Sequence, residues 1–335
     1  MFDRAKAFRN VSDTLTIAME YDPARAALVV ADERCELARL LLEAYREAMP
    51  GARVVLYDGT SADDARAAFD ALAPFDLAVL VQSSVFRIPD FRIRVELYRR
   101  DIKVVEHSQL ERMGPEEIEH YFAALAYDPA YYRTVGHSLK ARLDTARSAR
   151  IDSGGETLRF DTPLETAKVN IGHFVGLKNF GSQFPIGEVF TEARDLSSVN
   201  GRAKLYAFTD TSMRLNAPEE PITMVVEHGR VTDAVHSTDE FDLVLATIRK
   251  DEGEVWLREL GFGMNRGFSR HRRVSDVGAF ERVCGVHLSL GSRHGVYKKP
   301  HLNHREARYH VDSFVVTERV WLDEDVVFED GAWRV

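Results

Sequence analysis

Short apolar runs alternate with stretches of helical periodicity in the first half of the chain. The runs are ALVVA at 27–31, RVVLY at 53–57, LAVLV at 77–81 and IKVV at 102–105. Between the first two, leucines recur at helical spacing from Leu37 to Leu41, and the pattern stops at Pro50. Continuous apolar strands that alternate with helices are typical of a parallel sheet covered on both faces. The pattern predicts a doubly wound α/β domain.

The residues after the first apolar run argue against a dinucleotide cofactor. The sequence at 31–36 is ADERCE, whereas the phosphate-binding loop of such domains reads GxGxxG. We therefore expect no NAD, although the carboxyl ends of such strands often bind other ligands. A helical stretch at 115–143 follows, and its charged residues are typical of a solvated helix face.

The pattern changes near Ser153-Gly154-Gly155, where short β-type runs replace the alternation. The runs lie at 157–160, 167–171, 203–208, 222–226, 230–234, 255–260 and 314–321. Turn signals such as Asn200-Gly201 and His228-Gly229 separate them, and one helical region lies at 241–250. We predict two domains: a Rossmann-like domain at 1–150 without the dinucleotide motif, and a mainly β (α+β) domain at 151–335.

Composition narrows the class of protein. The 335 residues suit two domains, and 45% hydrophobic with 29% charged residues is ordinary for a soluble protein. The net charge of −9 argues against a nucleic-acid partner. No apolar run approaches the ~20 residues that span a bilayer, and the N-terminus lacks a secretory signal, so we expect a cytoplasmic protein without a membrane partner. Cys35 and Cys284 form no CxxC motif, which indicates small core residues rather than a disulfide or a thiolate zinc site.

Candidate chemistry gathers at 284–315, which holds His287, His294, His301, His304, His310 and Asp312. His310 and Asp312 are two residues apart in a β-type run, so their side chains share one face of a strand. With His287 from a separate segment they would form a two-histidine, one-carboxylate set. Such a set suits a divalent metal with open coordination positions. The alternative is that these are surface or capping residues without a metal.

Two glutamates are unusual in their surroundings. Glu188 lies in GEVFT and Glu259 in ELGFGMN, both next to apolar residues and glycines. A carboxylate buried without a partner is strongly unfavourable, so each should meet a cation, a metal or hydrogen-bond donors. Alternatively each points to solvent or pairs with Arg258, Arg266 or Arg293.

Taken together, these motifs resemble the metal-binding pattern of the aminopeptidase T and S metallopeptidases. The matching stretches, in order, are GEVFT, ELGFGMN, GVHLSLG and YHVD, within residues 180–315. The resemblance implies an α/β N-terminal domain, a C-terminal domain that carries all ligands, a homodimer and a two-metal site. In that site Glu188 would bridge two zinc-type ions, and Glu259 with Asp312 would complete them.

One position departs from the peptidases. They carry a catalytic tyrosine seven residues after the first histidine, where this chain has His294; Tyr297 lies nearby as a candidate substitute. The segment resembles more closely a sister group of the same fold, the 2,5-dihydroxypyridine 5,6-dioxygenases, which hold a single iron through two histidines and an aspartate. Carried over, the iron ligands would be His287, His310 and Asp312.

In the iron interpretation, the remaining coordination positions serve substrate and O₂. His294 would relay protons beside the catalytic carboxylates Glu188 and Glu259. Arg293 would hold an anionic group of the substrate, unless it is simply a surface arginine, and Asn265 and Tyr297 are further candidate substrate contacts.

We thus expect a metal-dependent enzyme, with Fe(II) favoured and Zn possible. It would carry out oxidative tailoring or ring cleavage of a small heteroaromatic or peptide-derived substrate. One alternative is a two-metal, aminopeptidase-like peptide hydrolase. The other is a non-catalytic peptide-binding protein derived from that fold, for example in peptide natural-product biosynthesis.

Overall fold

The computed structural model describes residues 3–174, 180–300, 302 and 306–335. The chain divides into two compact units. Unit 1 comprises Met1–Arg133, Asn170–Ile186 and Gly267–Phe280, and unit 2 comprises Thr134–Val169, Gly187–Arg266 and Glu281–Val335. The chain therefore passes between the units several times, and two short segments of its second half belong to unit 1.

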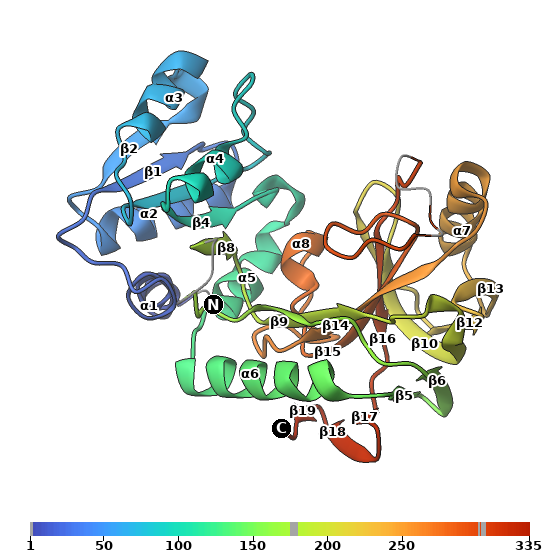
Figure 1. The fold of residues 1–335 in the computed structure, drawn as a ribbon. Coiled ribbons are helices and arrows are strands. Elements are labelled where there is room, and N and C mark those ends of the chain that lie inside the picture. Colours follow the sequence, from blue (N-terminus) through green and yellow to red (C-terminus); the bar gives the residue numbers. More distant parts are fainter. Residues whose placement is uncertain (1–2, 175–179, 301, 303–305) are drawn as a thin grey trace. The chain divides into compact units, whose positions relative to one another are not determined.

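Unit 1 is built on a parallel sheet in the order β2-β1-β3-β4-β8 (Figure 1). Its strands are β1 (Ala27–Ala31), β2 (Arg53–Leu56), β3 (Leu77–Val81), β4 (Lys103–His107) and β8 (Gly181–Gln183). Every residue of β1 and β3 is buried, as expected for strands covered on both faces. The predicted α/β class is confirmed. β8 was not predicted, because its short polar sequence, Gly-Ser-Gln, carries no strand signal.

The helices of unit 1 follow the predicted periodicity where it is strong. They are α1 (Arg4–Asp13), α2 (Glu36–Ala48), α3 (Ala62–Asp70), α4 (Ile93–Arg99), α5 (Ile118–Ala124) and α8 (Val277–Phe280). Ser61 caps α3 by accepting a hydrogen bond from the Asp64 N–H at 3.1 Å. The stretch at 115–143 is not one helix: α5 ends at Ala124, and α6 (Pro129–Thr145) begins anew at a proline.

A buried polar chain lies inside unit 1. His107 Nδ1 and the Tyr121 hydroxyl are 2.7 Å apart, and the Tyr45 hydroxyl lies 2.6 Å from His107 Nε2. The Tyr121 hydroxyl donates to the Phe184 carbonyl at 3.0 Å, so its oxygen accepts from His107 Nδ1–H. His107 Nε2 then accepts from Tyr45, and the chain is satisfied with a neutral imidazole.

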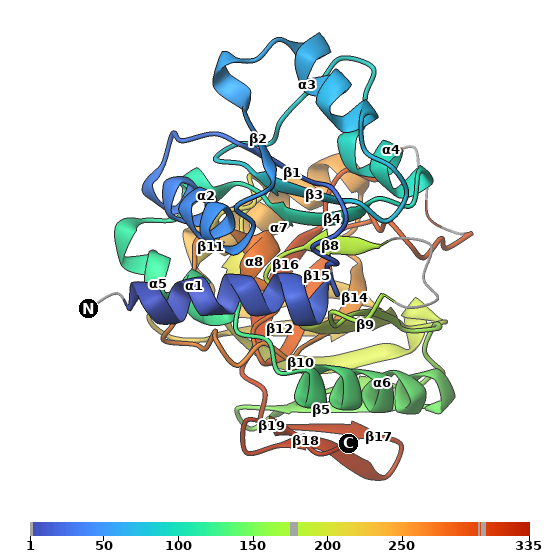
Figure 2. The ribbon, with the colours of Figure 1, turned by 90° about the vertical axis from the view of Figure 1, so that its left-hand side faces the viewer.

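Unit 2 is built on an antiparallel sheet in the order β19-β18-β17-β5-β6-β10-β16-β15-β14-β9-β7, with β11 and the β12–β13 hairpin attached at β10 (Figures 1 and 2). Its first strands are β5 (Ala149–Ser153), β6 (Glu156–Phe160), β7 (Lys168–Asn170), β9 (Glu188–Glu192), β10 (Val199–Thr209), β11 (Leu215–Asn216), β12 (Ile222–Glu227) and β13 (Arg230–Val235). After α7 (Asp239–Glu252) come β14 (Leu257–Gly263), β15 (Gly285–Leu290), β16 (Val311–Val315), β17 (Arg319–Leu322), β18 (Asp325–Glu329) and β19 (Ala332–Trp333).

Two local predictions in unit 2 are wrong. Residues 314–321 are not one strand, because β16 ends at Val315 and β17, which begins at Arg319, pairs with different neighbours. Asn200-Gly201 is not a turn but lies inside β10. A Cβ on Gly201 would lie 2.2 Å from the Thr157 carbonyl oxygen, so glycine is needed there for close approach of β6.

Among the helices in the described part of the chain, none is long and apolar enough to cross a membrane.

Candidate metal centre

Neighbouring strands of unit 2 supply the centre. β14, β15 and β16 lie side by side, and their register sets Glu259 opposite Ser289 and Ser289 opposite Asp312. Directly opposed residues of antiparallel strands share a face, and His287 shares it because it lies two residues from Ser289. Short antiparallel strands thus bring together three residues that lie far apart in the sequence.

Gly261 makes room for one of these side chains. It lies opposite His287, and a Cβ at this position would lie 2.1 Å from the imidazole ring. A real Cβ is never found so close to another heavy atom, so any larger residue would displace the ring. The glycine of the ELGFGMN motif therefore has a spatial function that spacing alone did not reveal.

Acidic and histidine side chains converge here in three overlapping groups, each with ligand-type atoms within 4.8 Å of one another. The groups are Glu188–Glu259–His287, Glu259–His310–Asp312 and Glu281–His287–Asp312. Glu259, His287 and Asp312 each belong to two groups, so the three groups form one continuous cluster. The five residues that the motifs singled out as ligands all lie in it.

The predicted ligand set is brought together only pairwise. Among the described residues, Asp312 is grouped with His310 and separately with His287, but no single group contains all three. Asp312 is therefore the common member of the set. His301 and His304 of the same histidine-rich segment lie outside the described residues.

The pair His310 and Asp312 has the geometry of metal ligands. His310 Nδ1 lies 3.2 Å from the Arg293 carbonyl oxygen, to which it can only donate, so the lone pair of the neutral ring is on Nε2. That atom lies 3.4 Å from Asp312 Oδ1, a buried oxygen without a hydrogen bond among the described residues. Although burial disfavours the charged ring, Asp312 raises the pKa of His310 to about 10, so a proton lies between these two atoms in the metal-free chain, and a divalent cation would take its place. A ring nitrogen that donates to a backbone carbonyl is also the usual support of a metal-bound histidine.

His287 is fully buried between carboxylates. Its Nε2 lies 3.3 Å from Glu188 Oε1 and 3.4 Å from Glu259 Oε1. Burial disfavours the charged imidazole, but these carboxylates outweigh it and raise the pKa of His287 well above its usual range. In the same way burial opposes the charge on Glu259, yet His287 and His294 lower its pKa. The cluster is thus an environment that strongly favours positive charge.

Sequence reasoning missed Glu281 and Arg282, which follow α8 in the sequence FERV. Arg282 is buried, and its Nη1 lies 2.9 Å from Glu188 Oε2 and also pairs with Glu281. A charged pair between Phe280 and Val283 was a signal that could have found them, since charges inside an apolar stretch need partners. The backbone at Asn265 holds this segment in place, because its main-chain N–H donates to the Arg282 carbonyl at 2.8 Å.

His294 turns one ring nitrogen towards the cluster. Its Nδ1 accepts from the Val296 N–H at 3.1 Å, which places the proton of the neutral ring on Nε2. Nε2 lies 2.9 Å from Glu259 Oε2. Tyr297 is engaged elsewhere, since its hydroxyl donates to the Thr166 carbonyl at 2.7 Å.

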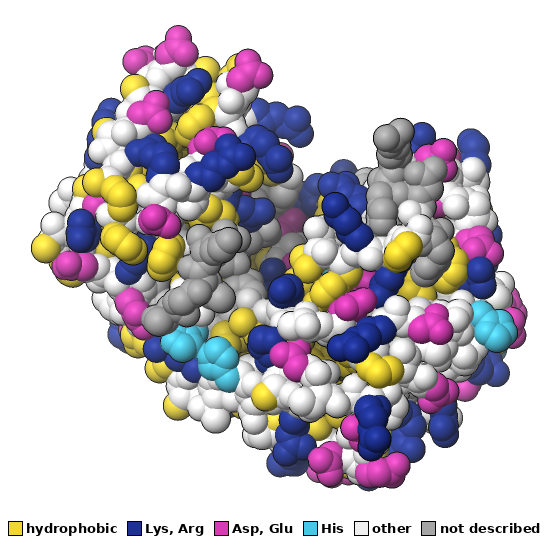
Figure 3. Space-filling view, in the orientation of Figure 1, with side chains coloured by type: hydrophobic (Ala, Val, Ile, Leu, Met, Phe, Trp, Pro, Cys, Tyr) yellow, Lys and Arg dark blue, Asp and Glu magenta, His cyan; other side chains and the backbone are white. Residues whose placement is uncertain are grey.

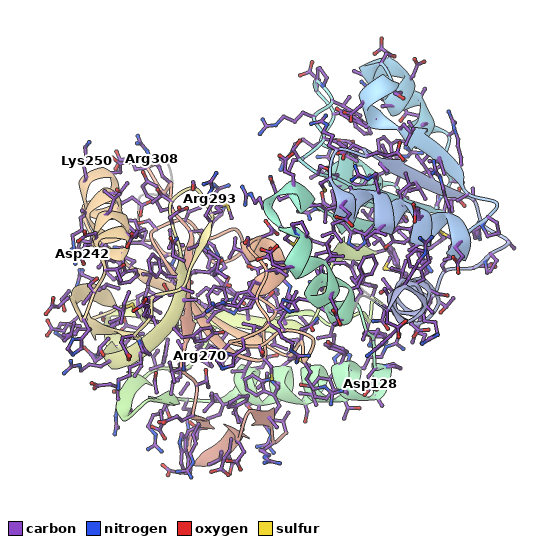
Figure 4. All side chains as sticks on the ribbon, turned by 180° about the vertical axis from the view of Figure 1, so that it is seen from behind. Asp128, Asp242, Lys250, Arg270, Arg293 and Arg308 are labelled. Carbon is purple, nitrogen blue, oxygen red and sulfur yellow. The ribbon has the colours of Figure 1, made fainter. Side chains whose placement is uncertain are left out.

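A buried arginine fixes the loop that carries His294. Arg258 Nη1 donates to the Ser292 carbonyl at 2.5 Å and Nη2 to the Tyr297 carbonyl at 3.0 Å, while Glu192 binds the same guanidinium. Arg258 therefore supports the loop rather than pairing with Glu188 or Glu259. Arg293 is exposed on this loop, at the same end of unit 2 as Arg308 and Lys250 (Figure 4).

The residues present fit a bound divalent cation. With both histidines neutral, as they must be to bind a metal, the carboxylates of Glu188, Glu259 and Asp312 outnumber the guanidinium of Arg282. Carboxylate and imidazole donors together suit Fe, Zn and related divalent metals. Asp312 Oδ1, which has no hydrogen-bond partner among the described residues, would gain a ligand bond. The cluster is thus a candidate divalent metal site.

No family model matches the sequence, and no curated protein matches it. The fold is similar to that of a 2,5-dihydroxypyridine dioxygenase from Pseudomonas putida KT2440, with a TM-score of 0.64, 14% sequence identity, and coverage of 99% of this chain and 98% of that chain. It is also similar to the wild-type AmpT of Thermus thermophilus, with a TM-score of 0.57, 13% identity, and coverage of 99% of both chains. The resemblance to the dioxygenase and aminopeptidase groups is confirmed at the level of the fold, which the chain shares over nearly its whole length.

Proposed function

We propose that this chain is a metal-dependent enzyme that binds one divalent metal, with Fe(II) favoured, through His287, His310 and Asp312. His287 and His310 are each grouped with Asp312 but not with each other, so binding would require the two rings to approach one another. The observation that carries the proposal is the pair His310 Nε2 and Asp312 Oδ1, two potential ligand atoms 3.4 Å apart and grouped with Glu259. Two histidines and a carboxylate leave coordination positions open, as in the non-haem iron oxygenases. The fold of the dioxygenase from Pseudomonas putida supports the same chemistry.

The position of Arg282 favours a site with one metal over a site with two. Two of the three candidate groups contain a carboxylate already paired with this guanidinium, namely Glu188 and Glu281. The group Glu259–His310–Asp312 contains no carboxylate paired with Arg282 among the described residues. A fixed positive charge beside Glu188 and Glu281 opposes a second dication there.

The residues around the metal position would handle the proton and the substrate. The metal would supply Lewis-acid and redox chemistry towards O₂ and a small heteroaromatic or peptide-derived substrate. His294 presents Nε2–H beside Glu259, a position from which it donates a proton or a hydrogen bond. Arg293, exposed on the same loop, would bind an anionic group of the substrate, and Asn265 would keep the Arg282 segment in place.

A second candidate is a two-metal, aminopeptidase-like hydrolase. The convergence of Glu188 and Glu259 with the two histidines and Asp312 favours it, because these are the donor types that such a site requires. The resemblance further implies a homodimer, which we carry as part of the proposal and which light scattering of the purified chain would test.

Metal analysis combined with oxygen uptake tests the proposal. The protein reconstituted anaerobically with Fe(II) should hold about one iron per chain, and His310→Ala should reduce this at least about tenfold while the circular dichroism stays unchanged. Phenolic, pyridine and peptide substrates should be screened for iron-dependent oxygen uptake.

The other outcomes separate the alternatives. About two zinc ions per chain with peptide hydrolysis would establish the hydrolase. No metal at any concentration, with peptide binding retained, would indicate the non-catalytic peptide-binding protein. Full metal occupancy in His310→Ala would refute the assigned ligands.

A further inference from the structure

We propose that unit 1 binds a small organic anion, a carboxylate on an apolar body, in a cavity of its own. The cavity has a volume of about 510 Å³, within the usual range for small-molecule sites. It lies at the carboxyl edge of the parallel sheet, lined by Leu80 of β3, Glu106 of β4 and the segment that joins β3 to α4. That edge is where open α/β sheets most often bind ligands.

The cavity carries an excess of positive charge. Arg87, Arg92 and Arg94 line it together with a single acidic residue, Glu106. Arg94 Nη1 pairs with Glu106 at 2.6 Å, whereas the side chains of Arg87 and Arg92 make no ion pair with any residue that the structure describes. Lys and Arg side chains gather on the face of unit 1 over α4 (Figure 3). In a chain of net charge −9, two unpaired guanidiniums at one cavity call for an anionic ligand.

The segment that carries Arg87 is held in place before any ligand arrives. The Tyr57 hydroxyl donates to the Arg87 carbonyl at 2.7 Å and accepts from the Arg87 N–H at 3.1 Å. The Tyr57 ring stacks on Phe86, with ring centroids 4.1 Å apart. Gln82, fully buried, accepts from the Phe86 N–H at 2.8 Å and donates to Glu106 at 3.0 Å. Such preorganisation lowers the entropic cost of binding.

The lining specifies the chemical class of the ligand. A guanidinium matches the two oxygens of a carboxylate with parallel hydrogen bonds. Among the apolar lining residues Val85 is 44% exposed, whereas Phe86, Ile88 and Phe91 are already buried. An aromatic or aliphatic body would therefore gain free energy mainly by covering Val85. A bare inorganic anion would use the arginines but not this apolar surface.

Calorimetric titration of the full chain tests the proposal. The probes are benzoate, its neutral analogue benzamide, and inorganic phosphate. Benzoate should bind with a Kd below about 1 mM, and benzamide and phosphate at least about tenfold more weakly. The double variant Arg87→Ala/Arg92→Ala should weaken benzoate binding at least about tenfold, because it removes both unpaired guanidiniums.

Two controls make the result specific. Arg99→Ala removes an exposed arginine of α4 that does not line the cavity, and it should leave benzoate binding within about twofold of the wild type. His310→Ala in unit 2 should also leave it unchanged. Loss of benzoate binding in His310→Ala would place the ligand at the metal centre and overturn the proposal. The proposal would also be overturned if benzamide or phosphate bound as tightly as benzoate, or if the double variant bound benzoate as tightly as the wild type.

Discussion

Two histidines, one in each unit, are both fully buried, yet their pKa values shift in opposite directions. Burial lowers the pKa of His107 in unit 1 to about 3, and its hydrogen-bond partners are the uncharged hydroxyls of Tyr45 and Tyr121. Burial acts in the same direction on His287 in unit 2, but Glu188 and Glu259 reverse it. Burial alone therefore keeps an imidazole neutral, and it is the surrounding carboxylates that make the unit 2 cluster favourable for a cation.

Removing the fixed cation from the cluster should have the largest effect. Arg282→Met would leave Glu188 and Glu281 without their guanidinium, and breaking such a buried pair costs about 3–5 kcal/mol. We expect this loss of unfolding free energy in the metal-free protein, with partial recovery when excess zinc is added, measured by chemical denaturation. Arg319→Met breaks an exposed ion pair with Glu329 and should cost less than about 1 kcal/mol. A metal-free Arg282→Met protein as stable as the wild type would contradict this view of the cluster.

Displacing His287 without changing any charge should have an intermediate effect. Gly261→Ala places a methyl group where the imidazole ring now lies, 2.1 Å from its atoms. We expect metal affinity to fall about 10–100-fold, as when the support of a ligand is lost, measured by competition with a chelator. Gly59→Ala is the matched control, because a Cβ there meets nothing within 4 Å. Unchanged affinity in Gly261→Ala would show that His287 is not a ligand.

The neutral histidine should make unit 1 sensitive to acid. Unfolded His107 takes up a proton near pH 6.5, whereas in the folded state it does so only near pH 3. The unfolded state therefore binds more protons between these values, and stability falls as the pH drops through this window. Between pH 7.5 and 5.0 this group should account for about 2 kcal/mol of lost unfolding free energy.

His107→Gln tests the point, since glutamine does not titrate. Denaturation of unit 1, followed at both pH values, should show a smaller loss in this variant than in the wild type. His271→Gln, at an exposed position, should keep the wild-type difference. An equal loss in His107→Gln would mean that other groups cause the acid sensitivity.

The sequence correctly predicted the features that depend on local residue patterns. The apolar runs of β1 and β3 lie where they were predicted, because strands buried on both faces need continuous apolar residues. The motif residues from Glu188 to Asp312 likewise converge, since their alternation on strands sets which face they share.

Features that depend on pairing between distant segments could not be predicted from the sequence. Arg282 can be recognised as part of the centre only after β14, β15 and β9 have been aligned, because nothing in its own segment indicates that it pairs with Glu188. Gly201 reads as a turn residue, yet it serves the approach of β6 to β10, a contact between segments some forty residues apart. Such features depend on register, which the local sequence does not specify.

The hydrogen bonds from Arg258 to the carbonyls of Ser292 and Tyr297 have a consequence for ligand recognition. A loop tied at both ends to a side chain of the underlying sheet has lost most of its conformational freedom during folding. His294 then meets an incoming molecule already in position, and little entropy remains to be lost at that moment.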